Sequence, residues 1–341
     1  MKYLFIPFAL MMINLSLLSQ AKVDSLMRVG IKYHDSFKYD EAIAAYKKAL
    51  KINPLAYAVH AELAMSYMYS KEYKKSIKHS DIVLEADSAD YKLHAYLSKG
   101  SCLDYLGKTE ESIVLFNEAL DRFGEHYLLY FNLGVNYYNI KDYDNAEHTF
   151  IKGIDQNPDH ASSHLYLGYT MEEKGQRVQS MLSLYYFLLL EPNTERSKTA
   201  YYKLKDQYKS NIKEEQVKKK KHVTIYVDSN QEDSTFASAD MMLSLLEATG
   251  SAIQSDTLIS EEEQFVKNTA SFFSVLGELN KEENEGFYWY FYVPFFYQIG
   301  ESEHNAAYCY YISQCENENA RHWLNQNQDA LSKFGDWLGG E

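Results

Sequence analysis

Four side chains of metal-binding types lie within nineteen residues near the C-terminus, at His304, Cys309, Cys315 and His322. Imidazole nitrogens and thiolates are the usual ligands of structural zinc, which is held by ligands at short and regular spacings. The spacing found here matches no finger or ribbon arrangement. The sequence therefore predicts no metal site.

Three adjacent carboxylates, Glu261, Glu262 and Glu263, are the other candidates for chemistry. Adjacent residues point in different directions on a helix, so these side chains suit the polar first turn of a helix better than paired acid and base catalysis. The eleven histidines form no helical metal pair, and the sequence has neither a Gly-rich phosphate loop nor a nucleophile elbow. We expect a non-enzymatic protein without a cofactor. An enzyme hidden in the C-terminal part is the least favoured alternative.

The three cysteines do not form the framework of a small disulfide-bonded domain. Cys309 and Cys315 are six residues apart, and on one helix they would lie on different faces, too far apart for a disulfide unless the helix breaks between them. Cys102 is expected to be a small core residue. A bond between Cys309 and Cys315 stays open as an alternative.

The first twenty-one residues have the pattern of a secretory signal peptide. Lys2 precedes an almost wholly apolar run over residues 4–18, and Ser19 and Ala21 are the small residues that a cleavage site requires. The run is shorter than the roughly 20 residues of a membrane-spanning helix, and Pro7 interrupts it. We expect cleavage after Ala21 or one residue earlier, and so an exported protein, periplasmic or secreted. An uncleaved anchor and a buried core helix are the alternatives.

Charge is distributed unevenly along the chain, whose net charge is −14. Residues 222–341 carry 20 Asp and Glu against 4 Lys and Arg, a net charge of −16. Such a surface repels phosphate groups, because nucleic-acid binding depends on Lys and Arg. We therefore expect no nucleic acid as a partner, and a solvated acidic face is the ordinary explanation for the excess.

Small residues recur at a nearly fixed spacing through the first two thirds of the chain. Gly30, Ala64, Gly100, Gly134 and Gly168 are separated by 34, 36, 34 and 34 residues. This is the period of a solenoid made of helix-turn-helix units. Glycine at these positions lets one helix backbone approach its neighbour, although it costs about 1 kcal/mol relative to alanine inside a helix.

The unit at residues 127–158 shows the pattern most completely, and the first unit repeats it at the same offsets. Gly134, Tyr137, Ala146, Phe150, Gly153 and Pro158 correspond to Gly30, Tyr33, Ala42, Tyr46, Ala49 and Pro54. In this pattern the chain resembles the tetratricopeptide repeat family over residues 23–192. The resemblance implies an all-α solenoid of about five helical hairpins. The prolines end the second helices because proline cannot continue a helix.

Two units depart from this pattern. In the second, Ser76, Ser80 and Ser88 stand where larger or terminating residues are expected, and the third has a two-residue insertion near Asp90. We expect less regular packing in these units. A further helix over residues 195–209 should cap the array with a polar face.

The first helices of stacked hairpins line the concave face of a solenoid. Residues of these helices that the repeat contacts do not use should line a binding groove: Met27, Ile31, Met65, Tyr69, Tyr105, Phe131, Asn132, Val135, Tyr138, Leu165 and Tyr169.

The composition of this groove bears on its ligand. Some members of the family hold a peptide's terminal carboxylate with Lys, Arg and Asn, but here only Asn132 resembles such a residue. An apolar groove favours an amphipathic helix or an extended hydrophobic segment of a protein. The alternative is that these side chains pack against neighbouring helices or against the chain's own C-terminal part.

The C-terminal region follows a basic linker at residues 213–222. After this linker, residues 223–227 are β-prone but lack a convincing partner strand. Helical patterns are expected at residues 239–248 and 262–279. Nine of the eleven residues from Phe287 to Tyr297 are aromatic, which predicts an aromatic-rich helical core; an exposed aromatic patch for a partner is the alternative. Pro294 should kink a helix or start a new one.

The sequence therefore predicts four parts, a signal peptide at residues 1–21, a solenoid with its capping helix at 22–212, a linker at 213–222 and an acidic helical domain at 223–341. The favoured function is an exported scaffold that binds a protein or peptide. The alternative is an assembly component whose groove is filled by its own C-terminal domain or by a second copy.

Overall fold

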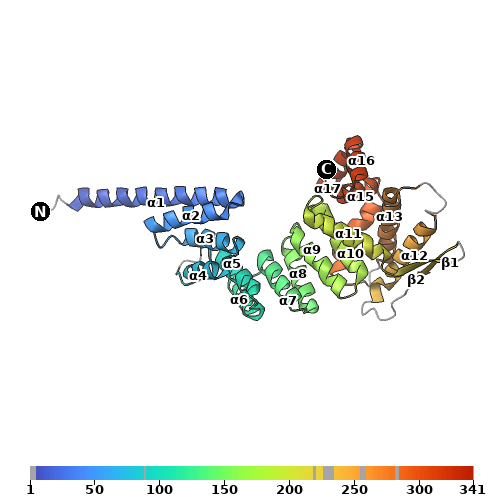
Figure 1. Ribbon diagram of the computed structural model, residues 1–341, viewed down its shortest axis with the longest axis horizontal. Helices are drawn as coiled ribbons and strands as arrows, with labels where there is room; N and C mark the ends of the chain where they lie inside the picture. Colours follow the sequence, from blue (N-terminus) through green and yellow to red (C-terminus); the bar gives the residue numbers. More distant parts are fainter. Residues whose placement is uncertain are drawn as a thin grey trace. The chain divides into compact units, whose positions relative to one another are not determined.

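The computed structural model describes residues 5–87, 90–217, 220–225, 234–253, 259–280 and 284–340. In this part of the chain, helices predominate and the sheet has two strands (Figure 1). The all-α expectation is confirmed except for this small sheet. The chain divides into two compact units, residues 1–149 and residues 150–341.

The first unit is a series of helical hairpins that pack in chain order. Its helices are α1 (Phe5–Asp35), α2 (Tyr39–Ile52), α3 (Tyr57–Tyr69), α4 (Tyr73–Leu84), α5 (Lys92–Tyr105), α6 (Thr109–Phe123) and α7 (Tyr127–Asn139), and α8 (Tyr143–Gln156) crosses the boundary between the units.

The second unit starts with the end of α8 and continues with the fifth hairpin and the C-terminal region. Its elements are α9 (Ala161–Glu173), α10 (Arg177–Leu190), α11 (Glu195–Lys209), β1 (Ile212–Val217), β2 (Lys220–Ile225), the short helix η1 (Ser234–Phe236), α12 (Ala237–Ile253), α13 (Glu261–Leu279), α14 (Phe287–Gly300), α15 (Asn305–Ser313), α16 (Glu318–Gln326) and α17 (Gln328–Gly339).

The five hairpin turns have one backbone geometry. Each has a residue with positive φ seven positions after the small residue of its unit: Phe37, Lys71, Gly107, Lys141 and Gly175. The next residue donates its N–H to a carbonyl five residues back, as Lys108 does to Leu103 at 2.9 Å. This bond satisfies a carbonyl at the helix end. Glycine adopts this conformation without strain, whereas Phe37 holds it as an 81% exposed aromatic residue.

In the first, third and fifth hairpins the glycine faces a bulky residue sixteen positions later, namely Tyr46, Phe116 or Leu184. A Cβ atom on Gly30 would lie 2.3 Å from the ring of Tyr46, and one on Gly100 would lie 2.2 Å from that of Phe116. The predicted close helix approach is therefore confirmed at these glycines. In the second hairpin, α3 and α4, Ala64 replaces glycine and the buried Ser80 replaces the aromatic ring. The two changes compensate in volume, although the Ser80 hydroxyl has no hydrogen-bond partner among the described residues.

Replacing Gly100 with alanine should lower the free energy of unfolding of the first unit by about 1–3 kcal/mol, because the added methyl group would overlap the Phe116 ring. Chemical denaturation followed by circular dichroism measures this loss. Gly335→Ala, measured on the unfolding of the second unit, is the control for the glycine-to-alanine change itself, because a Cβ there meets no atom within 4 Å and alanine is the better helix former. Equal effects of the two substitutions would contradict the close-contact explanation.

The second helix of the fifth hairpin, α10, is enclosed on all sides. Its buried residues run almost without interruption from Arg177 to Leu188. Besides α9 and α11, the helices α12, α14 and α15 pack against it. A helix that is apolar around its whole circumference needs such a cover.

Helix α11 occupies the range expected for the capping helix. Thr194 and Ser197 form a capping box at its start, which satisfies two backbone donors. Its apolar face is covered within the second unit, since Tyr201 and Tyr208 contact the ring of Phe265 on α13. The helix therefore joins the hairpins to the C-terminal region rather than ending the packed structure.

The expectation that residues 223–227 lack a partner strand was wrong. Within the described range, β2 pairs in antiparallel fashion with β1, and Ile212 lies opposite Ile225. Much of the basic segment at residues 213–222 therefore lies in a β-hairpin, whose strands contact α12. The repeat pattern ends before this hairpin, but the boundary between the two compact units lies earlier, after Thr149. The division into four parts predicted from the sequence therefore stays a proposal.

The aromatic segment at residues 287–297 lies in one helix, α14, which contains Pro294 in its interior. Phe287, Trp289, Tyr292 and Phe296 are buried, while Tyr290 is 60% exposed. The predicted aromatic core is confirmed. Glu261, Glu262 and Glu263 form the first turn of α13, as expected, behind a capping box of Ser260 and Glu263.

A buried ion pair joins α10 to α12. Arg177 donates from Nε to Asp240 Oδ1 at 2.6 Å, and both side chains are at most 8% exposed. Arg177 also donates to Ser244 Oγ at 2.8 Å and to the carbonyl of Gln207 at 3.2 Å. Asn211 donates to the second carboxylate oxygen of Asp240 at 3.1 Å. Burial lowers the pKa of Arg177, and Asp240 acts in the opposite direction.

Candidate protein-binding surface

The predicted groove residues of the first unit are partly accessible. Tyr69 and Tyr105 are 52% and 60% exposed, and the other side chains are half-buried: Met27, Ile31, Met65, Phe131, Asn132, Val135 and Tyr138. Met27 and Ile31 pack against the core formed by α1, α2 and α3. For these two residues the structure therefore supports the alternative that they pack within the hairpins.

Asn132 is engaged inside the first unit. Its Oδ1 accepts from Ser101 Oγ at 3.0 Å, and its Nδ2 donates to the carbonyl of Leu128 at 2.7 Å. The amide thus links α5 to α7. This geometry gives Asn132 a structural role and weakens its likeness to a peptide-gripping asparagine.

Tyrosines form pairs where consecutive repeats meet, and one ring of each pair is exposed. Tyr39 at the start of α2 stacks on Tyr69 at the end of α3, with ring centroids 5.5 Å apart. Tyr73 at the start of α4 lies against Tyr105 at the end of α5 at 5.1 Å. We call these two pairs the tyrosine pairs. His34 contacts both rings of the first pair edge-on, and burial lowers its pKa.

The third junction has polar residues at the corresponding positions. Thr109 and Asn139 both donate to the carboxylate of Asp104, at 2.7 and 2.8 Å. The surface along these junctions therefore changes from aromatic to acidic between α5 and α7.

Sequence reasoning missed Tyr39 and Tyr73, which complete the tyrosine pairs. Both are the ninth residue after the small residue of their unit and begin a second helix. This repeated position was a usable signal. It was overlooked because only first helices were expected to contribute to the surface.

In the second unit, Leu165 is buried and Tyr169 is half-buried. Tyr169 packs near Tyr166, and the ammonium group of Lys203 lies 5.3 Å from its ring centroid. Helix α11 thus covers part of α9. These contacts favour the packing alternative for the two predicted residues of this unit.

The C-terminal helices contact the fifth hairpin through aromatic residues. Tyr186 on α10 meets Phe291 and Phe295, and Tyr185 contacts Phe273 on α13 at 5.0 Å. Tyr308 donates to the carbonyl of Tyr185 at 3.1 Å. Within this unit the C-terminal region therefore packs largely on the second helix of the hairpin.

His164 connects α9 to α14. Its Nε2 lies 2.8 Å from the carbonyl oxygen of Pro158, which can only accept, so Nε2 carries the proton. Its Nδ1 then accepts from the hydroxyl of Tyr292 at 2.6 Å. Burial lowers the pKa of His164 to about 3. The ring is therefore neutral at neutral pH.

The residues considered for zinc do not form a site in the structure. Cys309 is buried and its pKa is raised to about 12 by burial, while His304 contacts the rings of Phe334 and Trp337. Among the described residues, no group of three or more His, Cys, Asp and Glu could hold a metal ion. All three cysteines are free thiols.

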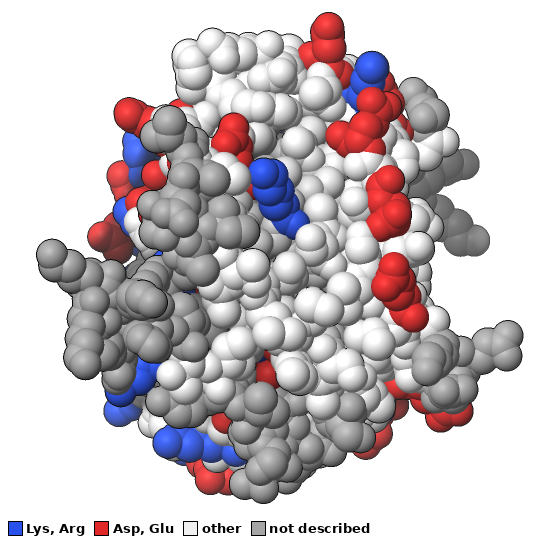
Figure 2. All heavy atoms as spheres, turned by 90° about the vertical axis from the view of Figure 1, so that its right-hand side faces the viewer, with Lys and Arg blue, Asp and Glu red and all other residues white. Residues whose placement is uncertain are grey.

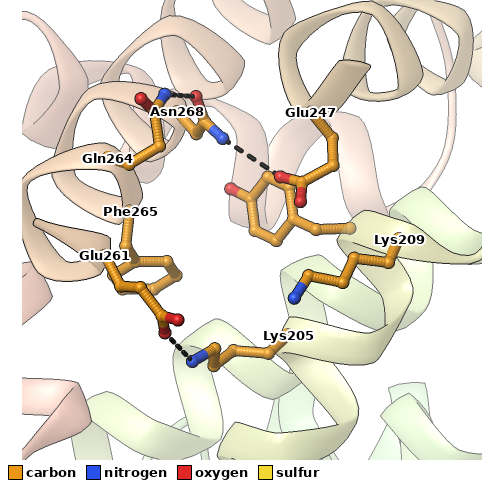
Figure 3. A pocket seen from close by; sticks show the side chains of 8 residues that line it. Lys205, Lys209, Glu247, Glu261, Gln264, Phe265 and Asn268 are labelled. Atoms are coloured by element: carbon orange, nitrogen blue, oxygen red, sulfur yellow. Dashed lines mark hydrogen bonds and ion pairs between the residues drawn. The ribbon is translucent and has the colours of Figure 1, made fainter. Parts of the chain in front are cut away.

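A small cavity of about 80 Å³ lies among α11, α12 and α13 (Figure 3). Five of its polar side chains pair with one another: Lys205 with Glu261 at 3.2 Å, Gln264 with Asn268 at 2.7 Å, and Asn268 with Glu247 at 3.4 Å. Its lining includes no Ser, Cys or His. The space suits a few water molecules better than an organic substrate.

The face seen in Figure 2 is largely uncharged. Asp and Glu gather toward its margins, and Lys and Arg are sparse on the described part of it.

Helix α1 continues without a break from Phe5 to Asp35. Leu17 and Leu18 are exposed, and Val23 is 1% exposed in the core of the first hairpin. Within the described part of the chain, none of the helices has both the length and the apolar character that crossing a bilayer requires.

Comparison with known families identifies the repeats. Residues 23–56 match one sequence model described as "Tetratricopeptide repeat", and residues 93–126 and 127–160 match another with the same description. The chain contains tetratricopeptide repeats. The second and fifth repeats are not matched, and in the second Ala64 and Ser80 replace the glycine and the aromatic residue. A comparison with curated proteins found no match.

Several solved structures are similar to about half of this chain. A crystal structure of MamA protein shares 24% identity, covers 54% of this chain and 96% of its own, and has a TM-score of 0.40. A thermophilic TPR protein of Thermus thermophilus shares 15% identity over 54% of this chain and 98% of its own, with a TM-score of 0.48. YrrB, described as a TPR protein with an unusual peptide-binding site, shares 19% identity over 52% of this chain and 90% of its own, at 0.39.

Proposed function

We propose that this protein is an exported, non-enzymatic scaffold whose first four repeats bind a segment of another protein. The observation that carries this proposal is the exposure of one ring in each tyrosine pair. These rings, Tyr69 and Tyr105, stand at the same position of consecutive first helices. Packing within a repeat does not require a large side chain that is half exposed. Aromatic residues of this kind are enriched in protein interfaces.

Export is supported by where the folded core begins. The first matched repeat starts at residue 23, and Val23 is the first buried side chain among the described ones. Residues 17–18 and 20–22 are exposed. Cleavage after Ala21 would therefore remove no buried side chain in the range 17–21, and the core of the first hairpin would stay intact.

In-cell cross-linking tests the proposal. Protein isolated from its native envelope should begin at Ala21 or Lys22 and carry a cross-linked protein partner identified by mass spectrometry. The double variant Tyr69→Ala/Tyr105→Ala should lose most of this partner, because interface aromatics contribute disproportionately to affinity. Tyr202→Ala is the matched control, as Tyr202 is 48% exposed and lies on α11 in the second unit.

Two results would contradict the proposal. An unprocessed N-terminus would refute export by signal cleavage. An unchanged set of partners in the folded double variant would refute binding through the tyrosine pairs, and cross-links between copies of this chain alone would favour the assembly function instead.

A further inference from the structure

The tyrosine pairs lie at the ends of two first helices that are neighbours in the array. Tyr69 and Tyr105 are the last residues of α3 and α5, and these two helices pack directly against each other. The axes of packed helices are about 8–10 Å apart. One turn of a polyproline II helix contains three residues and rises about 9 Å. Residues three apart in such a segment would therefore meet consecutive tyrosine pairs.

Each tyrosine pair combines a fixed ring with an accessible one. Tyr39 and Tyr73 are half-buried and hold their exposed partners Tyr69 and Tyr105 by ring contacts. Proline rings pack well on such aromatic surfaces, which is how proline-rich segments are recognised in several small domains. The polyproline II backbone makes no internal hydrogen bonds, so its carbonyls can accept from a phenol hydroxyl such as that of Tyr69.

The polar third junction limits the aromatic surface. At the position that would continue the row of tyrosine pairs, Thr109 and Asn139 donate to Asp104. Two consecutive aromatic contacts suit two prolines separated by two residues. A residue three positions further along would face the Asp104 carboxylate, where a basic side chain is complementary.

An amphipathic helix fits this surface less well. Such a helix needs a continuous apolar trough for anchors spaced at i, i+4 and i+7. In the first unit Met27 and Ile31 are partly used by the core. The most exposed side chains of the predicted groove are instead the two separate rings of Tyr69 and Tyr105, each of which ends in a hydroxyl group.

We infer that the tyrosine pairs bind a proline-rich segment in the polyproline II conformation, which deepens the proposed protein-binding function and depends on it. The two prolines of a Pro-x-x-Pro sequence would lie on the pair of Tyr39 and Tyr69 and on the pair of Tyr73 and Tyr105.

Fluorescence anisotropy with a fluorescein-labelled oligoproline tests this inference on the chain lacking residues 1–21 and on the full chain. We expect saturable binding of the oligoproline and none of a Gly-Ser peptide of the same length. Tyr69→Ala/Tyr105→Ala should weaken binding by about tenfold or more. Tyr69→Phe/Tyr105→Phe keeps the rings and should retain most of the affinity, while Tyr202→Ala should leave it unchanged. Circular dichroism confirms that each variant is folded.

The inference is overturned if the folded wild-type protein does not bind oligoproline, or if the alanine double variant binds it as tightly as the wild type does. It is also overturned if a labelled amphipathic helical peptide binds at the tyrosine pairs and oligoproline does not. In that last case the proposed function stands, because cross-linking to a native partner would still depend on Tyr69 and Tyr105. If cross-linking to the native partner were also unchanged in the Tyr69→Ala/Tyr105→Ala variant, both the proposed function and this inference would be refuted.

Discussion

Replacing Asp240 with alanine should lower the free energy of unfolding of the second unit by about 3–5 kcal/mol, because the buried guanidinium group of Arg177 would lose its counter-charge. The ion pair itself need not be strongly stabilising, since taking both charges out of water is costly. Removing one partner leaves that cost without compensation. Chemical denaturation followed by circular dichroism and tyrosine fluorescence measures the loss.

The control for Asp240→Ala is Glu261→Ala, which breaks an ion pair in the same unit. Lys205 and Glu261 are 3.2 Å apart, but their side chains are 34% and 75% exposed. Exposed pairs contribute about 0–1 kcal/mol. The joint replacement Arg177→Met/Asp240→Leu should recover much of the stability lost in Asp240→Ala. Similar small effects of Asp240→Ala and Glu261→Ala would show that the Arg177 site is more hydrated than the structure indicates.

Acidification from pH 7.5 to pH 5 should lower the free energy of unfolding of the second unit by about 2 kcal/mol through His164 alone. The pKa of His164 is about 3 in the folded protein, against about 6.5 for an unfolded histidine. Between these values the unfolded chain binds more protons than the folded chain. The stability contributed by the neutral ring is therefore complete above pH 6.5 and is lost as the pH falls toward 3.

Unfolding titrations at several pH values, with wild type and His164→Gln, measure this effect. Glutamine can donate to the carbonyl of Pro158 and accept from Tyr292 without titrating, so its pH dependence should be flatter. His322→Gln is the control for a histidine-to-glutamine change at an exposed position, on α16. Parallel pH profiles for His164→Gln and wild type would contradict the assignment.

The repeat architecture was predictable because close helix packing requires a small residue at the same position of each hairpin, and these residues recur at a nearly fixed spacing in the sequence. Gly30 and Gly100 can be recognised from the sequence since each must lie against a ring, that of Tyr46 or Phe116. The β-hairpin was not predictable in the same way. Its first strand, which contains Lys213, Glu214 and Glu215, lacks the alternation of apolar residues that marks a strand. Its contacts are with β2 and with α12, which lies further along the chain.

The candidate surface was only partly predictable. Tyr69 and Tyr105 were expected on it, but their partners Tyr39 and Tyr73 come from second helices, and only the folded arrangement brings these rings together. Asn132 was chosen by residue type, yet its neighbours Ser101 and Leu128 use its amide group. The link between Arg177 and Asp240, sixty-three positions apart in the sequence, has no local signature at all.

The enclosure of α10 determines where the number of hairpins in this protein can change. Solenoids gain or lose units readily because each unit contacts only its neighbours. Helix α10, however, contacts α12, α14 and α15 as well as α9 and α11. A duplicated hairpin inserted after α10 would have to reproduce all of these contacts, the ion pair of Arg177 with Asp240 included. Duplication or deletion is therefore expected among the hairpins from α1 to α8, whereas the fifth hairpin and the C-terminal helices should be inherited as one block.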